Sequence, residues 1–401
     1  MVGGAWLWAL LSCSCAPDAP DSGGRDTVAA ETGAGDTGAP DTALDDTSAD
    51  TGPVDTHDSA DTGEPIDADV VLYVVVEGVD EGNDCTDPEN PCASPEHAVA
   101  QLSTIEPALA VRISIGPGEY EVYTLDLTGR SSLTLAGAGV EETVLRAPFP
   151  DDGLVPAPVV GVSGDNVTVS GLTITGISAD EANGAGVMVF GPSSGIVLRD
   201  LRIDGTWSGA TPGGALGVNL LAPAADMGID ARLLRLQVIG FTFKAGVLLK
   251  GGFQETVFDG CVFYGNDHAI GMTNEIGGTV DPEVVIVNSI FVGNRVGASV
   301  HMPLTDPASV RVDWNLFGPT DQPVERLDLG VGNLEATEPL FRSAPEDLTL
   351  QSTAEGDPAC SPAIDAGDPA SPWSAEPAPN GERVNLGHQG NTDAASRSCG
   401  E

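Results

Sequence analysis

A five-residue pattern, in which two apolar side chains alternate with a variable residue and a glycine follows, recurs along the middle of the chain. It occurs at Leu133/Leu135/Gly137, Leu172/Ile174/Gly176, Leu201/Ile203/Gly205, Leu236/Val238/Gly240, Cys261/Phe263/Gly265, Ser289/Phe291/Gly293 and Trp314/Leu316/Gly318. The last six glycines are separated by 29, 35, 25, 28 and 25 residues. Two-residue alternation is typical of strands with one buried face. The repeat therefore predicts short strands that meet at regularly spaced corners.

This spacing favours a parallel β-helix. One coil cannot bury its inward face alone, so coils must stack at the strand spacing of about 4.8 Å. We interpret the glycine column as a corner between sheets, where the backbone is left-handed or crowded. The predicted fold class is all-β, a single-stranded right-handed parallel β-helix over residues 69–350.

The main alternative is an antiparallel β-sandwich, which shows hairpin turns every 8–12 residues or so. Asp-Gly pairs stand at 152–153, 204–205 and 259–260, but two of them fall inside the repeat. Helical patterns between the strands are missing, which disfavours a doubly wound α/β sheet.

The charge balance excludes two classes of partner. The chain of 401 residues has Asp+Glu 60 and Lys+Arg 16, a formal net charge of −44. Such a surface repels phosphate, so we expect no nucleic-acid partner. It also lacks the basic residues that attract anionic lipid, so a membrane contact would have to be made through a lipid anchor.

The N-terminus resembles a lipoprotein signal over residues 1–13. An apolar stretch at 5–11 is too short to span a bilayer and leads into Leu10-Leu11-Ser12-Cys13, which is similar to a bacterial lipobox. That resemblance implies lipidation of Cys13, with Cys15 as the second choice. An ordinary signal peptide with two incidental cysteines is the alternative.

Residues 14–68 form a low-complexity acidic linker in which Asp-Thr recurs seven times. Residues 16–68 contain 14 acidic residues and one basic residue, Arg25. Such a segment cannot bury enough apolar surface to offset its ordering entropy, and its like charges repel. We predict a disordered tether that holds the folded part away from its anchor.

Both ends of the repeat region carry motifs of one family. Residues 90–94 (Asn-Pro-Cys-Ala-Ser), a predicted capping helix over 94–102 and residues 115–120 (Ile-Gly-Pro-Gly-Glu-Tyr) resemble the start of the bacterial right-handed β-helix, or pectin lyase-like, surface proteins. Residues 360–369 and 379–387 resemble the closing segment of the same group. The resemblance covers about residues 70–399 and implies a C-terminal capping segment over 351–401.

The seven cysteines predict two disulfides. Cys85 and Cys92 bracket a loop of turn-forming residues, and a bridge between Cys360 and Cys399 would staple the C-terminal cap. Cys261 falls in the inward column and is predicted to be a buried thiol. The scheme implies an oxidising compartment.

Catalytic candidates are few. A polysaccharide lyase needs a basic residue to abstract a proton, and the two lysines, Lys244 and Lys250, flank one strand. A glycosidase needs paired acids, for which the pair Asp267 and His268 is the nearest candidate. The structural alternative is an outward polar ladder of Thr242, Asp267 and Arg295, and we favour it.

Metal and cofactor predictions are limited to one loop. Asp80, Asp84 and Asp87 offer several oxygen ligands that suit calcium, although their spacing is not that of an EF-hand. An ordinary solvated loop is the alternative that we favour, so no cofactor is predicted apart from a possible calcium ion.

Taken with the resemblance, these features predict a non-catalytic lipoprotein of the cell surface or outer membrane of a Gram-negative bacterium. Its β-helix would bind extracellular polysaccharide or a surface protein, or serve structural display. A secreted protein is the alternative location. A carbohydrate-active enzyme, either a polysaccharide lyase or a glycosidase, is the alternative function.

Overall fold

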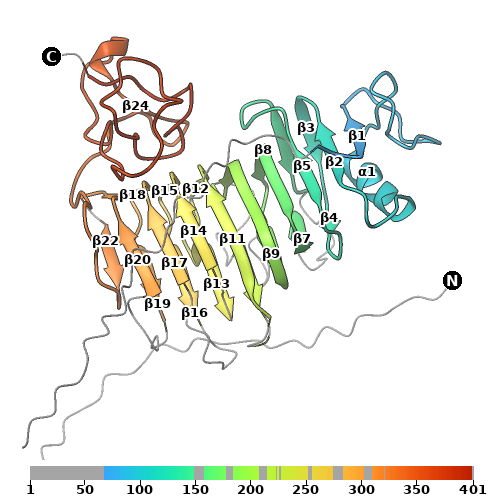
Figure 1. Ribbon diagram of the computed structural model, residues 1–401, viewed down its shortest axis with the longest axis horizontal. Helices are drawn as coiled ribbons and strands as arrows, with labels where there is room; N and C mark the ends of the chain where they lie inside the picture. The colour runs from blue at the N-terminus through green and yellow to red at the C-terminus, as the bar shows by residue number, and fades with distance from the viewer. Residues whose placement is uncertain are drawn as a thin grey trace, which may run out of the picture. The chain divides into compact units, whose positions relative to one another are not determined.

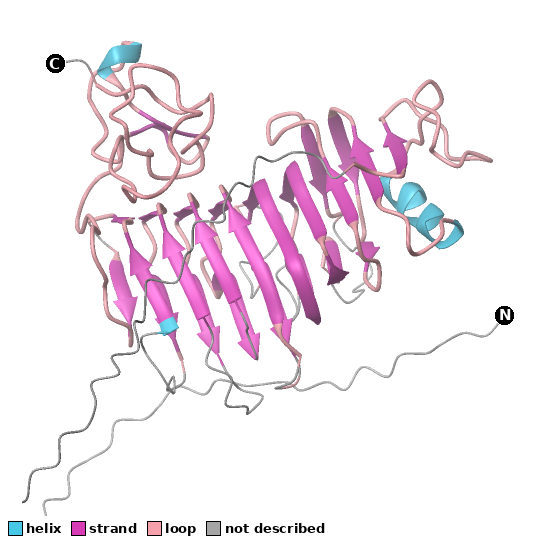
Figure 2. Cartoon of the chain, viewed as in Figure 1, coloured by secondary structure: helices cyan, strands magenta, loops and turns pink. Residues whose placement is uncertain are grey.

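A computed structural model describes residues 67–148, 158–177, 184–206, 215–222, 224, 227–251, 255–273, 283–301, 309–319 and 321–399. The predicted signal, the lipidation residue Cys13 and nearly all of the tether lie outside these residues. Within them, parallel strands stack coil upon coil, with one short α-helix at the N-terminal end (Figures 1 and 2). No helix in the described ranges is both long and apolar enough to cross a membrane.

The first sheet contains the strand that opens each coil. Its members pair in parallel in the order β1 (Val70–Val74), β2 (Val111–Ile115), β5 (Leu133–Ala136), β8 (Val167–Thr175), β9 (Ala185–Asp204), β11 (Ile229–Leu234), β14 (Glu255–Asp259), β17 (Glu283–Val287) and β20 (Val310–Asp313). The parallel register between successive coils confirms the predicted β-helix.

The second sheet follows the first in each coil. Its members are β3 (Gly118–Glu121), β6 (Thr143–Arg146), the C-terminal parts of β8 and β9, then β12 (Gln237–Ile239), β15 (Val262–Tyr264), β18 (Ile290–Val292) and β21 (Leu316–Phe317).

The third sheet closes each coil. It consists of β4 (Leu125–Leu127), β7 (Val160–Asp165), the N-terminal part of β9, β10 (Leu216–Ala222), β13 (Ala245–Gly251), β16 (His268–Thr273), β19 (Val296–Val300) and β22 (Gln322–Glu325). Strand β9 is long enough to contribute to all three sheets.

Aliphatic side chains fill the inside of the coils, as the low aromatic content of 5% predicts. Inward columns place like residues on one another at the strand spacing. The rings of Phe263 and Phe291 stack with centroids 4.9 Å apart, and those of Phe291 and Phe317 stack at 4.8 Å. Cys261 is fully buried in its column as predicted, and burial raises the pKa of its thiol to about 12.

The predicted glycine corner is left-handed in four of the six later repeats. Gly176, Gly240, Gly265 and Gly293 have φ between 67° and 80°, whereas Gly205 and Gly318 have no positive φ. A second left-handed column, which the repeat pattern did not predict, lies at the corner between the first and second sheets. Its members are Gly171, Asp200, Arg235, Gly260, Asn288 and Trp314.

Two of the seven predicted repeats were out of register. Leu133 pairs with Val167 in the first sheet, so its repeat does not align with Leu172 in the second. Phe317, rather than Leu316, pairs with the inward Phe291. A slip of one residue exchanges the two faces of a strand, so Leu316 points outward.

Buried asparagines form hydrogen-bonded ladders at two corners. Asn266 accepts a hydrogen bond from the amide of Phe241, and Asn294 accepts one from the amide of Asn266. Asn315 extends a parallel ladder, in which its side chain accepts from the Ser289 amide. These ladders satisfy backbone groups that the corners would otherwise leave unpaired inside the protein.

The N-terminal end is covered as predicted. Helix α1 (Pro95–Gln101) begins after Ser94, whose hydroxyl accepts a hydrogen bond from the His97 amide, and a 3-10 turn, η1 (Leu102–Thr104), follows it. The helix contacts β1, β2 and β4. The predicted disulfide between Cys85 and Cys92 is present beside it.

The C-terminal module, residues 339–399, lies against the second sheet. It contains the antiparallel strands β23 (Phe341–Ser343) and β24 (Asp347–Leu350), a 3-10 turn, η3 (Thr353–Glu355), and the predicted disulfide between Cys360 and Cys399. The coil strands end at Glu325, so the predicted boundary at residue 350 falls inside this module. Its apolar residues pack on outward side chains of four successive coils, Ile239, Val262, Ile290 and Leu316.

Polar contacts fix the module to the second left-handed corner. The side chain of Asn288 donates to Ser371 and accepts from the Asp368 amide, while its carbonyl accepts from the Gly387 amide. A Cβ atom at Gly367 would lie 2.7 Å from the Asn288 side-chain oxygen, so glycine permits this approach. The guanidinium of Arg383 lies over the Trp314 ring at 4.6 Å. The motifs at 360–369 and 379–387 thus provide much of the docking contact.

Candidate functional site

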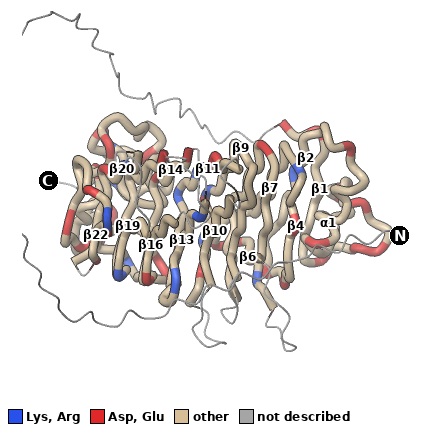
Figure 3. The backbone as a smooth tube through the Cα atoms, turned by 90° about the horizontal axis from the view of Figure 1, so that it is seen from below, with Lys and Arg blue, Asp and Glu red and all other residues tan. Residues whose placement is uncertain are grey.

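Two places in the molecule could act on a ligand. One is the edge and outer surface of the third sheet, which carries most of the predicted catalytic residues. The other is a cleft between the second sheet and the C-terminal module, which no sequence pattern predicted. Basic positions are few along the chain, and acidic positions line the loops around α1 (Figure 3).

The residues that precede the last four strands of the third sheet form a column of alternating charge. The register of β13, β16, β19 and β22 aligns Lys244, Asp267, Arg295 and Asp321. The predicted ladder was correct for Asp267 and Arg295 but wrong for Thr242. Two extra residues, Thr242 and Phe243, lengthen that corner, so Lys244 takes the aligned position.

Asp267 and Arg295 form the predicted ion pair. Arg295 Nε lies 2.5 Å from Asp267 Oδ1, and its Nη2 donates to Oδ2 at 3.2 Å. The hydrogen bond that Arg295 donates to Asp267 raises the pKa of Arg295. The Arg295 side chain is 57% exposed, so the pair contributes little to stability.

His268 is held from both sides of its ring. Arg295 Nη2 contacts His268 Nε2, and His268 Nδ1 lies 2.8 Å from the hydroxyl of Ser299, which is fully buried. The ring of His301 packs edge-on against it, with centroids 5.1 Å apart. Burial, followed by the charge of Arg295, lowers the pKa of His268.

These contacts fix the proton on the His268 ring. A guanidinium can only donate, so Nε2 must accept and the neutral ring carries its proton on Nδ1. His268 therefore donates to Ser299, whose hydroxyl can donate onward to the carbonyl of Ile270 at 3.3 Å. A histidine that acts as general base toward a serine would instead accept a hydrogen bond from the serine hydroxyl.

The two lysines lie at the two ends of one strand. Lys244 immediately precedes β13, and Lys250 is the sixth residue of that strand. Burial, with a smaller effect of Lys250, lowers the pKa of Lys244. Lys250 aligns with Leu221 and Thr273 on the neighbouring strands, so it stands apart from the column of alternating charge.

The three predicted calcium ligands each accept hydrogen bonds from nearby groups. Asp80 accepts from the amides of Ala93 and Ser94, and so supports the start of α1. Asp84 accepts from Thr86, and Asp87 accepts from the Glu89 amide. In the described parts of the chain, the only cluster of three His, Cys, Asp or Glu donor atoms is Cys85, Cys92 and His97, and its two cysteines are joined as a disulfide.

The cleft has a volume of about 520 Å³, which is within the usual range of small-molecule sites, about 300–1,000 Å³. One wall comes from the coils and the other from the module. The lining residues are Val140, Glu141, Asp200, Gln237, Glu346, Asp347, Leu348, Thr349, His388, Gln389, Thr392 and Ala394.

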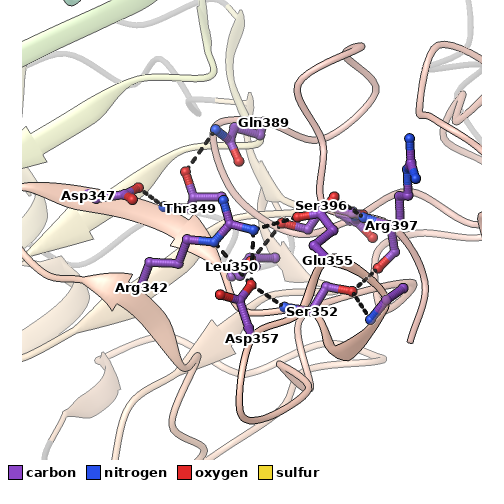
Figure 4. A network of polar contacts seen from close by, with 12 residues as sticks. Arg342, Asp347, Thr349, Leu350, Ser352, Glu355, Asp357, Gln389, Ser396 and Arg397 are labelled. Carbon is purple, nitrogen blue, oxygen red and sulfur yellow. Dashed lines mark hydrogen bonds and ion pairs between the residues drawn. The ribbon is translucent and has the colours of Figure 1, made fainter. Parts of the chain in front are cut away.

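Hydrogen bonds within and between the two walls hold the cleft in shape. Arg202 on the second sheet donates to the carbonyls of Pro345 and Glu346 in the module. Inside the module, Gln389 donates to the Thr349 hydroxyl at 3.1 Å. A separate network around Arg342 joins Glu355 and Asp357 (Figure 4).

His388 is the least solvated ionisable group of this cleft. Although part of the residue reaches the surface, burial lowers the pKa of its ring to about 4, with Asp347 acting in the opposite direction. The ring is therefore neutral at physiological pH. No ligand spacing surrounds His388 in the sequence, because Asp200 and Gln237, which line the same cleft, lie far away along the chain.

Comparisons with solved structures give similarities at low sequence identity. A rhamnogalacturonan lyase is 14% identical, with 71% of this chain and 97% of that chain covered and a TM-score of 0.43. A pectate lyase is 13% identical, with 80% and 96% covered and a TM-score of 0.39. A pectin methylesterase from Yersinia enterocolitica is 13% identical, with 62% and 94% covered and a TM-score of 0.37. No family model and no curated protein matches the chain.

Proposed function

We propose that this protein is a non-catalytic β-helix lipoprotein of the bacterial cell surface that binds extracellular polysaccharide. The observation that carries the non-catalytic part is the polarity of the His268 hydrogen bonds. The only orientation compatible with Arg295 makes the ring a donor to Ser299, and the serine hydroxyl is shielded from solvent. Asp267 is meanwhile paired with Arg295.

Polysaccharide binding is supported by the cleft and by the parallel β-helix itself. Stacked coils expose long, regular surfaces, and binding sites in repeat proteins lie along such surfaces. The cleft offers amides, hydroxyls and carboxylates, which are the groups that hydrogen bond to sugar hydroxyls. The solved structures that resemble this chain include a rhamnogalacturonan lyase and a pectate lyase, whose names refer to polysaccharides.

Surface attachment is proposed from the sequence of residues 1–68. The lipobox-like residues at 10–13 would give a lipidated Cys13, and the acidic linker would follow as a spacer. The test is incorporation of a labelled fatty acid during bacterial expression. Cys13→Ser is expected to abolish the label, while Cys15→Ser retains it; the reverse result would assign the anchor to Cys15.

The enzymatic alternative is tested on the same protein. The purified chain is incubated with acidic and neutral polysaccharides in the presence of calcium, while unsaturated products, reducing ends and binding are measured. We expect binding to at least one polymer and no product above a heat-denatured control. Product formation that disappears in Lys244→Ala, Lys250→Ala or His268→Gln would establish the enzyme instead.

A further inference from the structure

The cleft between the second sheet and the C-terminal module has an unbalanced charge. Four of its twelve lining residues are acidic, Glu141, Asp200, Glu346 and Asp347, and none is Lys or Arg. Asp200 is neutralised by Arg235, whose Nε and Nη2 donate to its two oxygens at 2.6 and 3.0 Å. The negative charge that faces the cleft therefore comes from three carboxylates.

Two of these three carboxylates have no partner within the described structure. Glu141 on the coil wall and Glu346 on the module wall accept no side-chain hydrogen bond from a described residue, whereas Asp347 accepts one from the Thr349 amide. The two glutamates come from opposite walls. A ligand between them would be contacted by both.

Uncharged hydrogen-bonding groups complete the lining. No hydrogen bond joins the His388 ring to a described residue, and the ring is neutral, so it can donate to or accept from a ligand without repelling a cation. The amide of Gln237 is held by Arg202 through its oxygen, which leaves its NH2 group for another acceptor. Sugar hydroxyls both donate and accept, so they suit this mixture.

We propose that this cleft binds a polysaccharide segment that carries protonated amino groups, as in a de-N-acetylated amino-sugar polymer. Glu141 and Glu346 would contact the ammonium groups, while His388 and the amides contact hydroxyls. Uronate polymers would be repelled by the same carboxylates. The inference rests on the proposed polysaccharide-binding function and specifies its ligand class and its place.

The test compares four oligosaccharides of equal length on the purified full chain, by calorimetric titration in a mildly acidic buffer. They are a glucosamine oligomer, its N-acetylated form, a neutral glucan and a polygalacturonate. The glucosamine oligomer is expected to bind at least about tenfold more tightly than the other three, and its affinity is expected to fall with added salt. Equal binding of the N-acetylated form, or preferred binding of the uronate, overturns the proposal.

A matched pair of variants locates the binding. Glu141→Gln combined with Glu346→Gln removes two negative charges from the cleft and is expected to weaken glucosamine binding by about tenfold. Glu81→Gln combined with Glu335→Gln removes the same charge from exposed positions outside the lining and is expected to change affinity less than about twofold. Equal loss in both variants shows bulk charge attraction and overturns the site.

Failure of this inference can be distinguished from failure of the proposed function. If the wild-type chain binds a polysaccharide and the cleft variant binds it equally well, the cleft assignment is wrong while polysaccharide binding stands. If no polymer binds, both fail. Thermal unfolding of each variant confirms that it is folded, which is expected because both glutamates are exposed.

Discussion

The outer surfaces of the second and third sheets differ within the same coils. In the second sheet, the outward residues Val262, Ile290 and Leu316 are fully buried beneath the C-terminal module. At the edge of the third sheet, the same coils carry the ion pair of Asp267 and Arg295. In these coils, the outer surface of the second sheet is thus buried, while the edge of the third sheet is exposed to solvent.

The difference shows how a β-helix stabilises a lateral module. A coil needs only its inward residues for its own core, so outward apolar residues indicate a surface that another element covers. Burial of one such side chain contributes about 1.5–3 kcal/mol. A surface ion pair contributes about 0–1 kcal/mol. We therefore expect the module, rather than the charged column, to determine the stability of the later coils.

The largest effect is expected from a charge placed under the module. Ile290→Asp would bury a carboxylate among Leu348, Leu350 and Leu386. We expect a loss of about 4 kcal/mol or more in the free energy of unfolding, because an unpaired charge is costly in an apolar environment. Denaturant unfolding measures the loss, and limited proteolysis reports release of residues 339–399.

Val144→Asp is the matched control. Val144 lies in the same outward column of the second sheet as Ile290, but outside the apolar cluster under the module. The same substitution there is expected to cost about 1 kcal/mol. Similar losses at the two positions would contradict the view that the module makes the difference.

The sequence predicted the architecture because its strongest signal is local. Two-residue alternation and repeated glycines define strands and corners without knowledge of the partners, and the capping helix carried its own N-cap and proline. Both disulfides and the buried Cys261 followed from loop position and column. Apart from the bridge between Cys360 and Cys399, which spans 39 residues and was predicted from the closing segment, these features depend on residues that are near one another in the chain.

The module and the cleft could not be located in this way, although one signal was present. From residue 238 onward, second-sheet strands contain adjacent apolar pairs, such as Val262-Phe263 and Ile290-Phe291, which indicate burial on both faces. That pattern reveals a covered face but not which segment covers it. The prediction that Thr242 aligns with Asp267 was wrong for another reason. Two extra residues at that corner shift the register, so counting two residues from the glycine does not reach the aligned position, which Lys244 occupies.

Because His388 lines the cleft under the module, the free energy of unfolding is expected to depend on pH. Burial lowers the pKa of His388 to about 4, from about 6.5 in an unfolded chain. As the pH falls below about 6.5, the unfolded chain takes up a proton that the native state excludes. Stability is therefore lost progressively between pH of about 6.5 and 4, by up to about 3 kcal/mol.

His388→Gln isolates this contribution. The difference in unfolding free energy between wild type and variant, measured across that pH range, is expected to shrink or change sign as the pH falls. Burial raises the pKa of Asp321 to about 6, which acts in the opposite direction, but Asp321 is present in both proteins and cancels. A difference that is independent of pH would contradict the buried, neutral state of His388.

The smallest effect is expected at the charged column of the third sheet. In a double-mutant cycle with Arg295→Gln and Asp267→Asn, the coupling energy should be about 0.2–1 kcal/mol and should fall with added salt, because the arginine is largely exposed.

The cycle also tests the orientation of His268. Without the Arg295 donor, the His268 ring is free to reverse its tautomer and accept from Ser299, so Arg295→Gln should shift the nitrogen chemical shifts of His268. Unchanged shifts would show that Arg295 does not set the proton position. A coupling well above 1 kcal/mol would show that the column, as well as the covered face, holds these coils together.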